Sequence, residues 1–122
     1  MNQDLFADLY TQLLGLIPEI LGVAWIADEG VILLQTGEMV ADEPIIGIAG
    51  AALMRLAEHI SAGLSECTTP EISIRCEQHT AFFVQADEHS ILMLVLPAEV
   101  DIRMLTGVVP SRIAALHGSG NK

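Results

Sequence analysis

Four histidines, some of them close to acidic residues, are the side chains of this chain best suited to acid–base or metal chemistry. His79 and His89 lie close in the sequence to Glu77 and to the pair Asp87-Glu88. A zinc site usually shows short, regular ligand spacings, such as two histidines four residues apart on one helix. No pair of the four histidines has that spacing. We therefore expect no metal site, and interpret His79 and His89 as solvated residues of turns.

Other catalytic arrangements are also missing from the sequence. The Gly47-x-x-Gly50 spacing lacks the lysine and the hydroxyl of a phosphate-binding loop, and no dinucleotide-binding fingerprint occurs. Cys67 follows an expected helix, where the helix dipole does not favour a thiolate, and Cys76 falls on the expected inner face of a strand. We expect no catalytic residues, no cofactor and no enzyme activity of the chain by itself.

Composition narrows the class of protein further. The 122 residues fit one domain, and sixteen Asp and Glu against five Lys and Arg give a net charge of −11. Nucleic acids and anionic membrane surfaces both attract basic patches, so neither is an expected partner. The N-terminus is acidic and the longest uncharged apolar run is shorter than a bilayer span, so we expect a cytoplasmic protein without membrane insertion.

The periodicity of apolar residues predicts one α+β domain over residues 1–117, followed by a flexible tail over 118–122. Because the two most apolar strands should meet in the middle, we expect a five-stranded antiparallel sheet in the order 2-1-5-4-3. The long helix should cover one face and the terminal helices the other. Gly107 and Pro110 interrupt the pattern of the last helix, so we expect a kink or a break before Ser111. The expected elements are a helix over 2–16, strands over 22–28 and 31–36, a helix over 45–66, strands over 71–77, 80–86 and 91–96, and a helix from about 98 to 116.

The long helix is the most informative element because its first half is apolar on every side. A helix that is hydrophobic all round is normally buried all round, and the hydrophobic share of 52% is high for a small monomer. We therefore predict a dimer, although burial of the helix within one monomer is the alternative. The expected seam includes an open edge strand, which invites pairing. Its residues are Ile46, Gly50, Leu53, Ala57, Ile72 and Ile74.

The second half of the same helix carries a mostly polar stripe at helical spacing. Such a stripe is a solvated face in the simplest reading, and a contact surface for a partner in the functional one. We predict that it binds the partner. The residues are Arg55, Glu58, His59, Ala62 and Glu66.

In its order of elements the chain resembles the Roadblock/dynein light chain superfamily. Three segments carry the resemblance: GLIPEILGVAWIADEGVIL, GIAGAALMRLAEHISAGLSE, and ILMLVLP before the last helix. Pro18, the Gly22-Val23 pair and the Asp28-Glu29-Gly30 turn stand where the family has comparable features. The chain departs from the family pattern at 19–21 and at Pro110. The resemblance spans roughly residues 4–116. Within the superfamily, the chain is similar to the bacterial gliding and polarity members.

The resemblance implies a profilin-like sandwich that forms a homodimer, or a heterodimer with a paralogue. It also implies a non-enzymatic module that regulates or scaffolds a small Ras-like GTPase, because the nucleotide chemistry resides on the partner. Two alternatives remain: a ligand-binding sensory domain of profilin-like or PAS-like architecture, and a structural light chain of a larger assembly.

Overall fold

The computed structural model describes residues 2–38, 44–64 and 70–120, with the side chains of 117–120 excepted. Three helices and five strands follow one another in the predicted order. The element bounds differ from the predicted ones mainly at the ends. The elements are α1 (Gln3–Leu16), β1 (Gly22–Ala27), β2 (Ile32–Gly37), α2 (Pro44–Gly63), β3 (Glu71–Arg75), β4 (His79–Asp87), β5 (Ser90–Pro97) and α3 (Ile102–Gly120).

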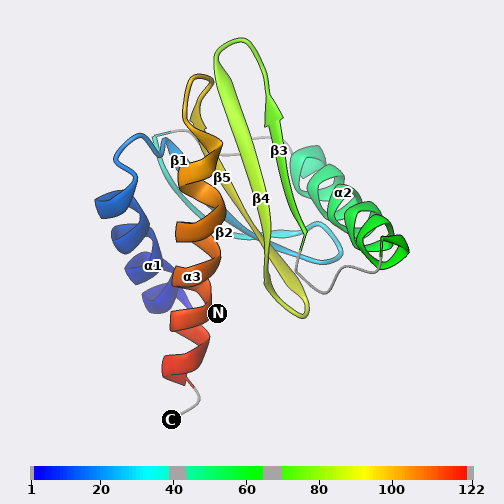
Figure 1. Cartoon of the computed structure of the whole chain (residues 1–122). Coiled ribbons are helices and arrows are strands. Elements are labelled where there is room, and N and C mark those ends of the chain that lie inside the picture. Colours follow the sequence, from blue (N-terminus) through cyan, green and yellow to red (C-terminus); the bar gives the residue numbers. More distant parts are fainter. Residues whose placement is uncertain (1, 39–43, 65–69, 121–122) are drawn as a thin grey trace.

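The five strands form one antiparallel sheet in the order β2-β1-β5-β4-β3 (Figure 1). This confirms the predicted order. The two central strands pair in a regular register that sets Trp25 opposite Leu92. Leu92 and Leu94 of β5 are fully buried on one face, and Ile91 and Met93 are buried on the other. A strand that is apolar on both faces is stable only when a layer of structure covers each face of the sheet. The central position of β5 in the sheet meets this requirement.

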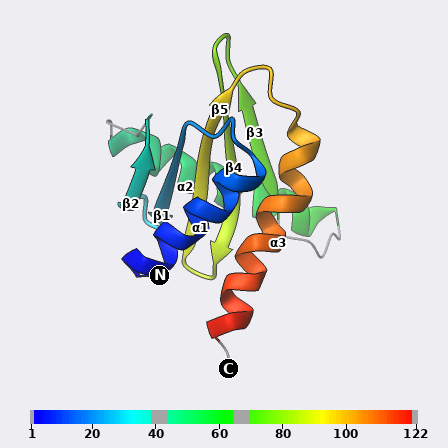
Figure 2. The same ribbon diagram turned by 90° about the vertical axis from the view of Figure 1, so that its left-hand side faces the viewer.

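Helices cover both faces of the sheet, as predicted. In Figure 2, α1 and α3 lie side by side in front of the sheet and α2 lies behind it. The layer under α1 and α3 contains the larger core. Its largest fully buried side chains are Leu9 and Leu13 of α1, Trp25 of β1, Phe82 of β4, Leu92, Leu94 and Leu96 of β5, and Leu105 and Val109 of α3.

The core beneath α2 is smaller. Only Met54 among its fully buried members comes from the helix. The other members belong to the sheet: Ala24, Ile26, Phe83, Ile91 and Met93. A helix with so few buried side chains keeps much of its apolar surface outside the core.

Of the predicted kink or break before Ser111, the break is wrong, because α3 is one helix over Ile102–Gly120 with Pro110 inside it. Proline removes one backbone hydrogen bond from a helix interior and normally kinks or breaks it. Here Val109 and Ile113, on either side of Pro110, are 0% and 4% exposed and belong to the same core. Packing on both sides of the proline accounts for the continuity of the helix.

The inner face of α3 includes Leu105, which is fully buried, but not its neighbour Met104, which is 40% exposed. The buried row runs at intervals of four residues through Leu105, Val109 and Ile113. The backbone of α3 continues to Gly120, into the segment predicted as a tail.

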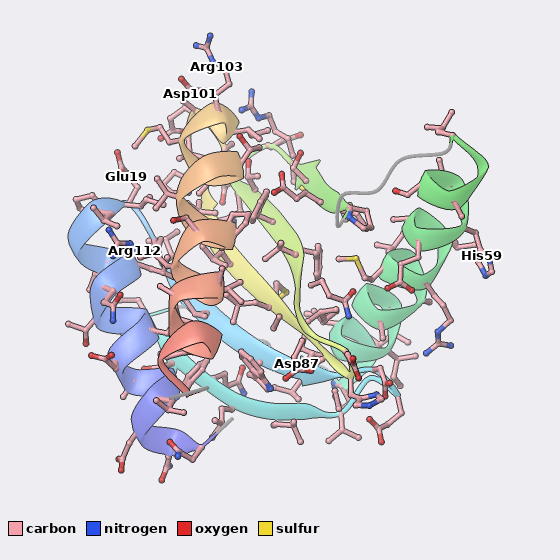
Figure 3. All side chains as sticks on the ribbon, turned by 60° about the horizontal axis from the view of Figure 1, so that its bottom comes forward. Glu19, His59, Asp87, Asp101, Arg103 and Arg112 are labelled. Carbon is pink, nitrogen blue, oxygen red and sulfur yellow. The ribbon has the colours of Figure 1, made fainter. Side chains whose placement is uncertain are left out.

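Asp101 caps the N-terminus of α3. Its carboxylate accepts a hydrogen bond from the backbone N–H of Arg103 at 3.0 Å, and the Arg103 side chain donates two more from Nε and Nη2, each at 3.1 Å. Figure 3 shows the pair at the exposed end of the helix. The hydrogen bonds from Arg103 lower the pKa of Asp101 below its ordinary value. The ionised form therefore stabilises the folded state.

Replacing Asp101 with alanine is expected to lower the melting temperature at pH 7, because the cap is lost. Asp101→Asn keeps a capping oxygen but cannot ionise, so it serves as the control. Because the pKa is lowered on folding, the ionic contribution is present above the ordinary aspartate pKa of about 3.9. It is lost as the pH falls through the lower folded value. Melting curves by circular dichroism should show wild type and the Asn variant converging at low pH; a constant separation would contradict the assignment.

Candidate interaction surface

The inner side of α2 is built from small residues that let the helix lie close to the sheet. A Cβ atom added at Gly50 would lie 2.7 Å from Cε2 of Phe83, and one added at Gly47 would collide with the backbone oxygen of Gly30. Gly30 itself has φ of 100°, a conformation that favours glycine. We had placed Gly50 in the dimer seam. That assignment is corrected, because Gly50 is buried against its own sheet.

The outer side of α2 carries five large aliphatic side chains that are each more than half exposed. We call these five residues the outer face of α2. Contiguous exposed apolar surface of this kind marks an interaction site in soluble proteins. Its members and their exposed fractions are Ile45 60%, Ile48 53%, Leu56 59%, Ile60 63% and Leu64 68%.

Sequence reasoning did not single out these residues, because the small residues at 47 and 50 fit a sheet and a second helix equally well. In the structure, the glycines at 47 and 50 mark the side of α2 that touches the sheet. The largest side chains must then point elsewhere, because residues on opposite sides of a helix cannot share one surface. Ile45, Leu56 and Ile60 lie together on that other side.

The remaining predicted seam residues lie between the outer face of α2 and the edge of the sheet. Ile46 and Ile72 are half-buried and pack against the smaller core. Leu53 and Ala57 are half-buried on α2, and Ile74 on β3 is 39% exposed. Within the described part of the chain, β3 pairs with β4 alone and forms one edge of the sheet. An apolar helix face and an unpaired strand edge therefore belong to the same side of the molecule.

The predicted polar stripe lies on the surface of α2. Arg55, Glu58, His59 and Ala62 are all exposed, and Glu66 lies outside the described residues. Figure 3 shows His59 pointing away from the sheet. Arg55 instead bends back, and its Nη2 donates a hydrogen bond to the backbone oxygen of Asp28 at 2.6 Å. This bond ties α2 to the turn between β1 and β2.

The histidines form no metal centre within the described residues, where no group of three His, Cys, Asp or Glu side chains is placed to hold an ion. His89 lies 3.5 Å from the carboxylate of Asp28 and 3.9 Å from that of Glu88, but the imidazole is 81% exposed. Cys76 is a free, exposed cysteine, which corrects our expectation of an inner position. Cys67 lies outside the described residues.

By length and composition alone, Pro44–Gly63 would be able to cross a membrane, with 20 residues and a mean hydropathy of 1.3. This is weak evidence, since helices of soluble domains pass the same test. Four residues of α2 are buried within the chain, and Met54 belongs to its core. The packing makes α2 a layer of this domain, and its remaining large apolar side chains face outward.

No protein-family model matches the sequence, and no curated protein matches it. Many solved structures, in contrast, have a fold similar to that of this chain. The gliding protein MglB from Thermus thermophilus aligns with a TM-score of 0.70 and 16% identity, covering 95% of this chain and 90% of that one. A Roadblock/LC7 domain from Streptomyces avermitilis aligns with a TM-score of 0.67 and 11% identity, covering 88% and 93%.

Profilins share the architecture at a greater structural distance. Profilin II from Acanthamoeba castellanii aligns with a TM-score of 0.59 and 20% identity, covering 92% of this chain and 95% of that one. Identities this low bear on the fold alone. The sheet order, the placement of the three helices and these likenesses together show that the chain has the Roadblock fold, as in MglB and the Roadblock/LC7 domains.

Proposed function

We propose that the chain is a cytoplasmic, non-enzymatic interaction module that dimerises through α2 and β3 and regulates or scaffolds a small Ras-like GTPase. The observation that carries the proposal is the outer face of α2, where five large aliphatic side chains are each more than half exposed. The β3 edge lies on the same side and, in the described residues, lacks a second partner strand.

The free energy gained when a second copy covers this surface is of the same size as the cost of association. Fully burying a large aliphatic side chain is worth about 1.5–3 kcal/mol, so covering the half that is exposed is worth about 1 kcal/mol for each side chain. Five side chains on each of two copies then supply about 10 kcal/mol, which is comparable to the cost of association of about 4–15 kcal/mol. Pairing of the β3 edges adds backbone hydrogen bonds to that sum.

Self-association is also a property of a structural neighbour. One MglB structure, which aligns with a TM-score of 0.70 and 16% identity, is described as having a tetrameric arrangement. A paralogue with the same surface would serve as well as a second copy, and mixing experiments distinguish the two.

The GTPase part of the proposal comes from the family resemblance, and the polar stripe supplies a surface for it. Arg55, Glu58 and His59 are exposed on α2 next to the outer face. A strongly acidic chain, with a net charge of −11, favours partners whose contact surface is basic. We therefore expect the partner GTPase to present basic residues to this stripe.

A GTP hydrolysis assay tests this function. The Ras-like GTPase encoded nearest to this chain's gene is assayed with and without the chain, and the chain is also assayed alone. We expect no turnover by the isolated chain, and a complex with the GTPase or a changed hydrolysis rate when both are present. Glu58→Arg should weaken the effect, because it replaces an exposed acidic side chain of the stripe with a basic one.

Glu19→Arg is the matched control, since Glu19 is exposed and lies near α1, in the layer opposite α2 (Figure 3). It should behave as wild type. Turnover by the rigorously purified chain would overturn the non-enzymatic assignment. The lack of both a complex and a rate change would overturn the assignment of a GTPase partner.

The sensory-domain alternative would need a site larger than the hollow beside α2. That hollow has a volume of about 120 Å³, whereas small-molecule sites usually measure about 300–1,000 Å³. The light-chain alternative differs from the proposal only in the identity of the partner.

A further inference from the structure

The edge strand β3 is complementary to its own reverse (Figure 1). Its five residues are Glu71-Ile-Ser-Ile-Arg75: an acid, an isoleucine, a serine, an isoleucine and a base. A second copy of the strand, turned by half a rotation about Ser73, sets the base opposite the acid and an isoleucine opposite each isoleucine. Two identical chains that use the same surface are related by such a rotation. The strand therefore has the pattern of a self-pairing edge.

The two faces of β3 carry different kinds of side chain. Ile72 pairs with Phe83 of β4 and packs against the smaller core under α2. Glu71 and Arg75 belong to the opposite face, because successive residues of a strand alternate. Arg75 accordingly reaches the segment before α3, where its Nη2 donates a hydrogen bond to the backbone oxygen of Val100 at 3.0 Å. The acid and the base thus share one face, and the two isoleucines share the other.

Glu71 is a half-buried carboxylate that lacks a cation within the described chain. Burial raises the pKa of its carboxyl above the ordinary value, because the charged form is less stable where water is partly excluded. Among the described residues, no arginine or histidine forms an ion pair with it. A cation that arrives from a second chain would offset this cost.

Only a few registers are available to a symmetric pair of β3 strands. The rotation keeps each face of the sheet on its own side, so residues that face each other across the seam must belong to the same face. The centre of the pairing must then fall on a residue. A centre on Ile74 sets Glu71 opposite Glu77 of the partner subunit, and like charges directly opposite are destabilising. A centre on Ile72 sets Glu71 opposite a serine and leaves Arg75 beyond the end of the other strand.

We propose that β3 recognises a second copy of this chain in the register centred on Ser73. Each Glu71 then faces Arg75 of the partner subunit, and each Ile72 faces Ile74 of the partner subunit. Cross-strand pairs of both kinds stabilise antiparallel sheets. Arg75 retains donors for this contact, because a guanidinium has five N–H groups and the bond to Val100 uses one of them. The inference rests on the proposed function, in that it takes the dimer through α2 and β3 as given and assigns its register and its second chain.

Charge exchange tests the register. Glu71→Arg and Arg75→Glu each set like charges opposite each other in their own homodimers, so each should raise the dissociation constant about tenfold at low salt. An equal mixture of the two variants should recover the wild-type affinity, because positions 71 and 75 again carry opposite charges across the seam. The double variant should also dimerise as wild type. Sedimentation measures the constants, and circular dichroism confirms that each variant is folded.

Self-recognition is tested by mixing ¹⁵N-labelled wild type with the unlabelled double variant Glu71→Arg, Arg75→Glu. Each protein forms complementary homodimers, whereas the mixed dimer sets like charges together at both pairs. Native mass spectrometry should therefore show a mixed fraction well below the roughly one half that random exchange gives. The matched control is Glu19→Arg combined with Arg112→Glu, an equal exchange of exposed charges in the other layer (Figure 3). It should mix with wild type at random.

A cysteine at the centre of the seam provides a second test that does not depend on charge. Ser73→Cys, in a chain that also carries Cys67→Ser and Cys76→Ser, should form disulfide-linked dimers under mild oxidation, because the two positions 73 lie directly opposite. Cys67→Ser alone keeps Cys76 and is the matched control. In this register the two copies of Cys76 lie six residues apart along the strands, about 20 Å, whereas a disulfide spans Cα atoms less than about 7 Å apart.

The register and the proposed function fail separately in these experiments. Dimers whose charge variants mix at random, or whose Ser73→Cys variant does not cross-link, would overturn the register and leave the proposed dimer standing. A monomeric wild-type protein would overturn the dimer and the register together. Selective pairing with a negative GTPase assay would instead overturn the partner class and leave the register standing.

Discussion

Leu56→Asp combined with Ile60→Asp is expected to convert the protein from a dimer to a monomer without unfolding it. Both side chains are mostly exposed in the single chain, at 59% and 63%, so the fold does not need them. In a dimer through the outer face of α2, each aspartate would be a buried, unpaired charge, which costs several kcal/mol. Light scattering at micromolar concentration should show the mass falling from twice 13.1 kDa to 13.1 kDa, with an unchanged circular dichroism spectrum.

Leu5→Asp combined with Leu16→Asp is the matched control. These leucines of α1 are 42% and 44% exposed, so the chemical change is the same but occurs on the other layer of the molecule. The control should remain a dimer. The proposed dimer interface would be overturned if the wild-type protein were monomeric at micromolar concentration. It would also be overturned if the control variant dissociated as much as the Leu56→Asp, Ile60→Asp variant. Ile46→Asp is a poorer test, since Ile46 packs against the smaller core and its loss would also unfold the chain.

Gly47→Ala is expected to reduce the free energy of unfolding by about 1–3 kcal/mol, the usual cost of overpacking. The new Cβ would collide with the backbone oxygen of Gly30, whose own φ of 100° leaves that turn little freedom to move. Alanine is the better helix former by about 1 kcal/mol, so the loss must exceed that gain. Urea unfolding followed by circular dichroism measures the difference.

Gly107→Ala provides the comparison within the same protein. Gly107 lies inside α3, and an added Cβ would have no atom within 4 Å. It should stabilise the protein by about 0.5–1 kcal/mol, because the helix propensity improves without a clash. If Gly47→Ala stabilised the protein to the same extent, α2 would not lie as close to the sheet as described here.

The sheet was predictable from the sequence because its strands differ in apolarity. Ile91-Leu-Met-Leu-Val-Leu96 is apolar on both faces and Glu71–Arg75 alternates, so the first had to be central and the second an edge. The orientation of α2 was not predictable in the same way. Its first half is apolar all round, so periodicity does not reveal which side meets the sheet. Small residues at 47 and 50 fit a second helix and a sheet equally well.

Two further differences also come from tertiary packing. Pro110 carries a strong local signal for a break, but the core contacts of Val109 and Ile113 outweigh it. The hollow beside α2 has no local signal in the sequence, because lining residues such as Asp28, Glu58 and Glu88 come together only through the fold. The polar stripe was predictable as a surface, but its role in binding remains a prediction.

The arrangement of α2, with small residues inward and bulky ones outward, would link the stability of the domain to its abundance if the proposed dimer forms. Pairing would then cover the outer face only in the associated state, so mass action would make the folded population depend on protein concentration. The melting temperature should accordingly rise on going from a dilute to a concentrated sample. In a cell, newly made chains that have not yet found a second copy would carry a surface that chaperones recognise. Balanced expression with any paralogue would then matter as much for the solubility of this protein as its own net charge of −11.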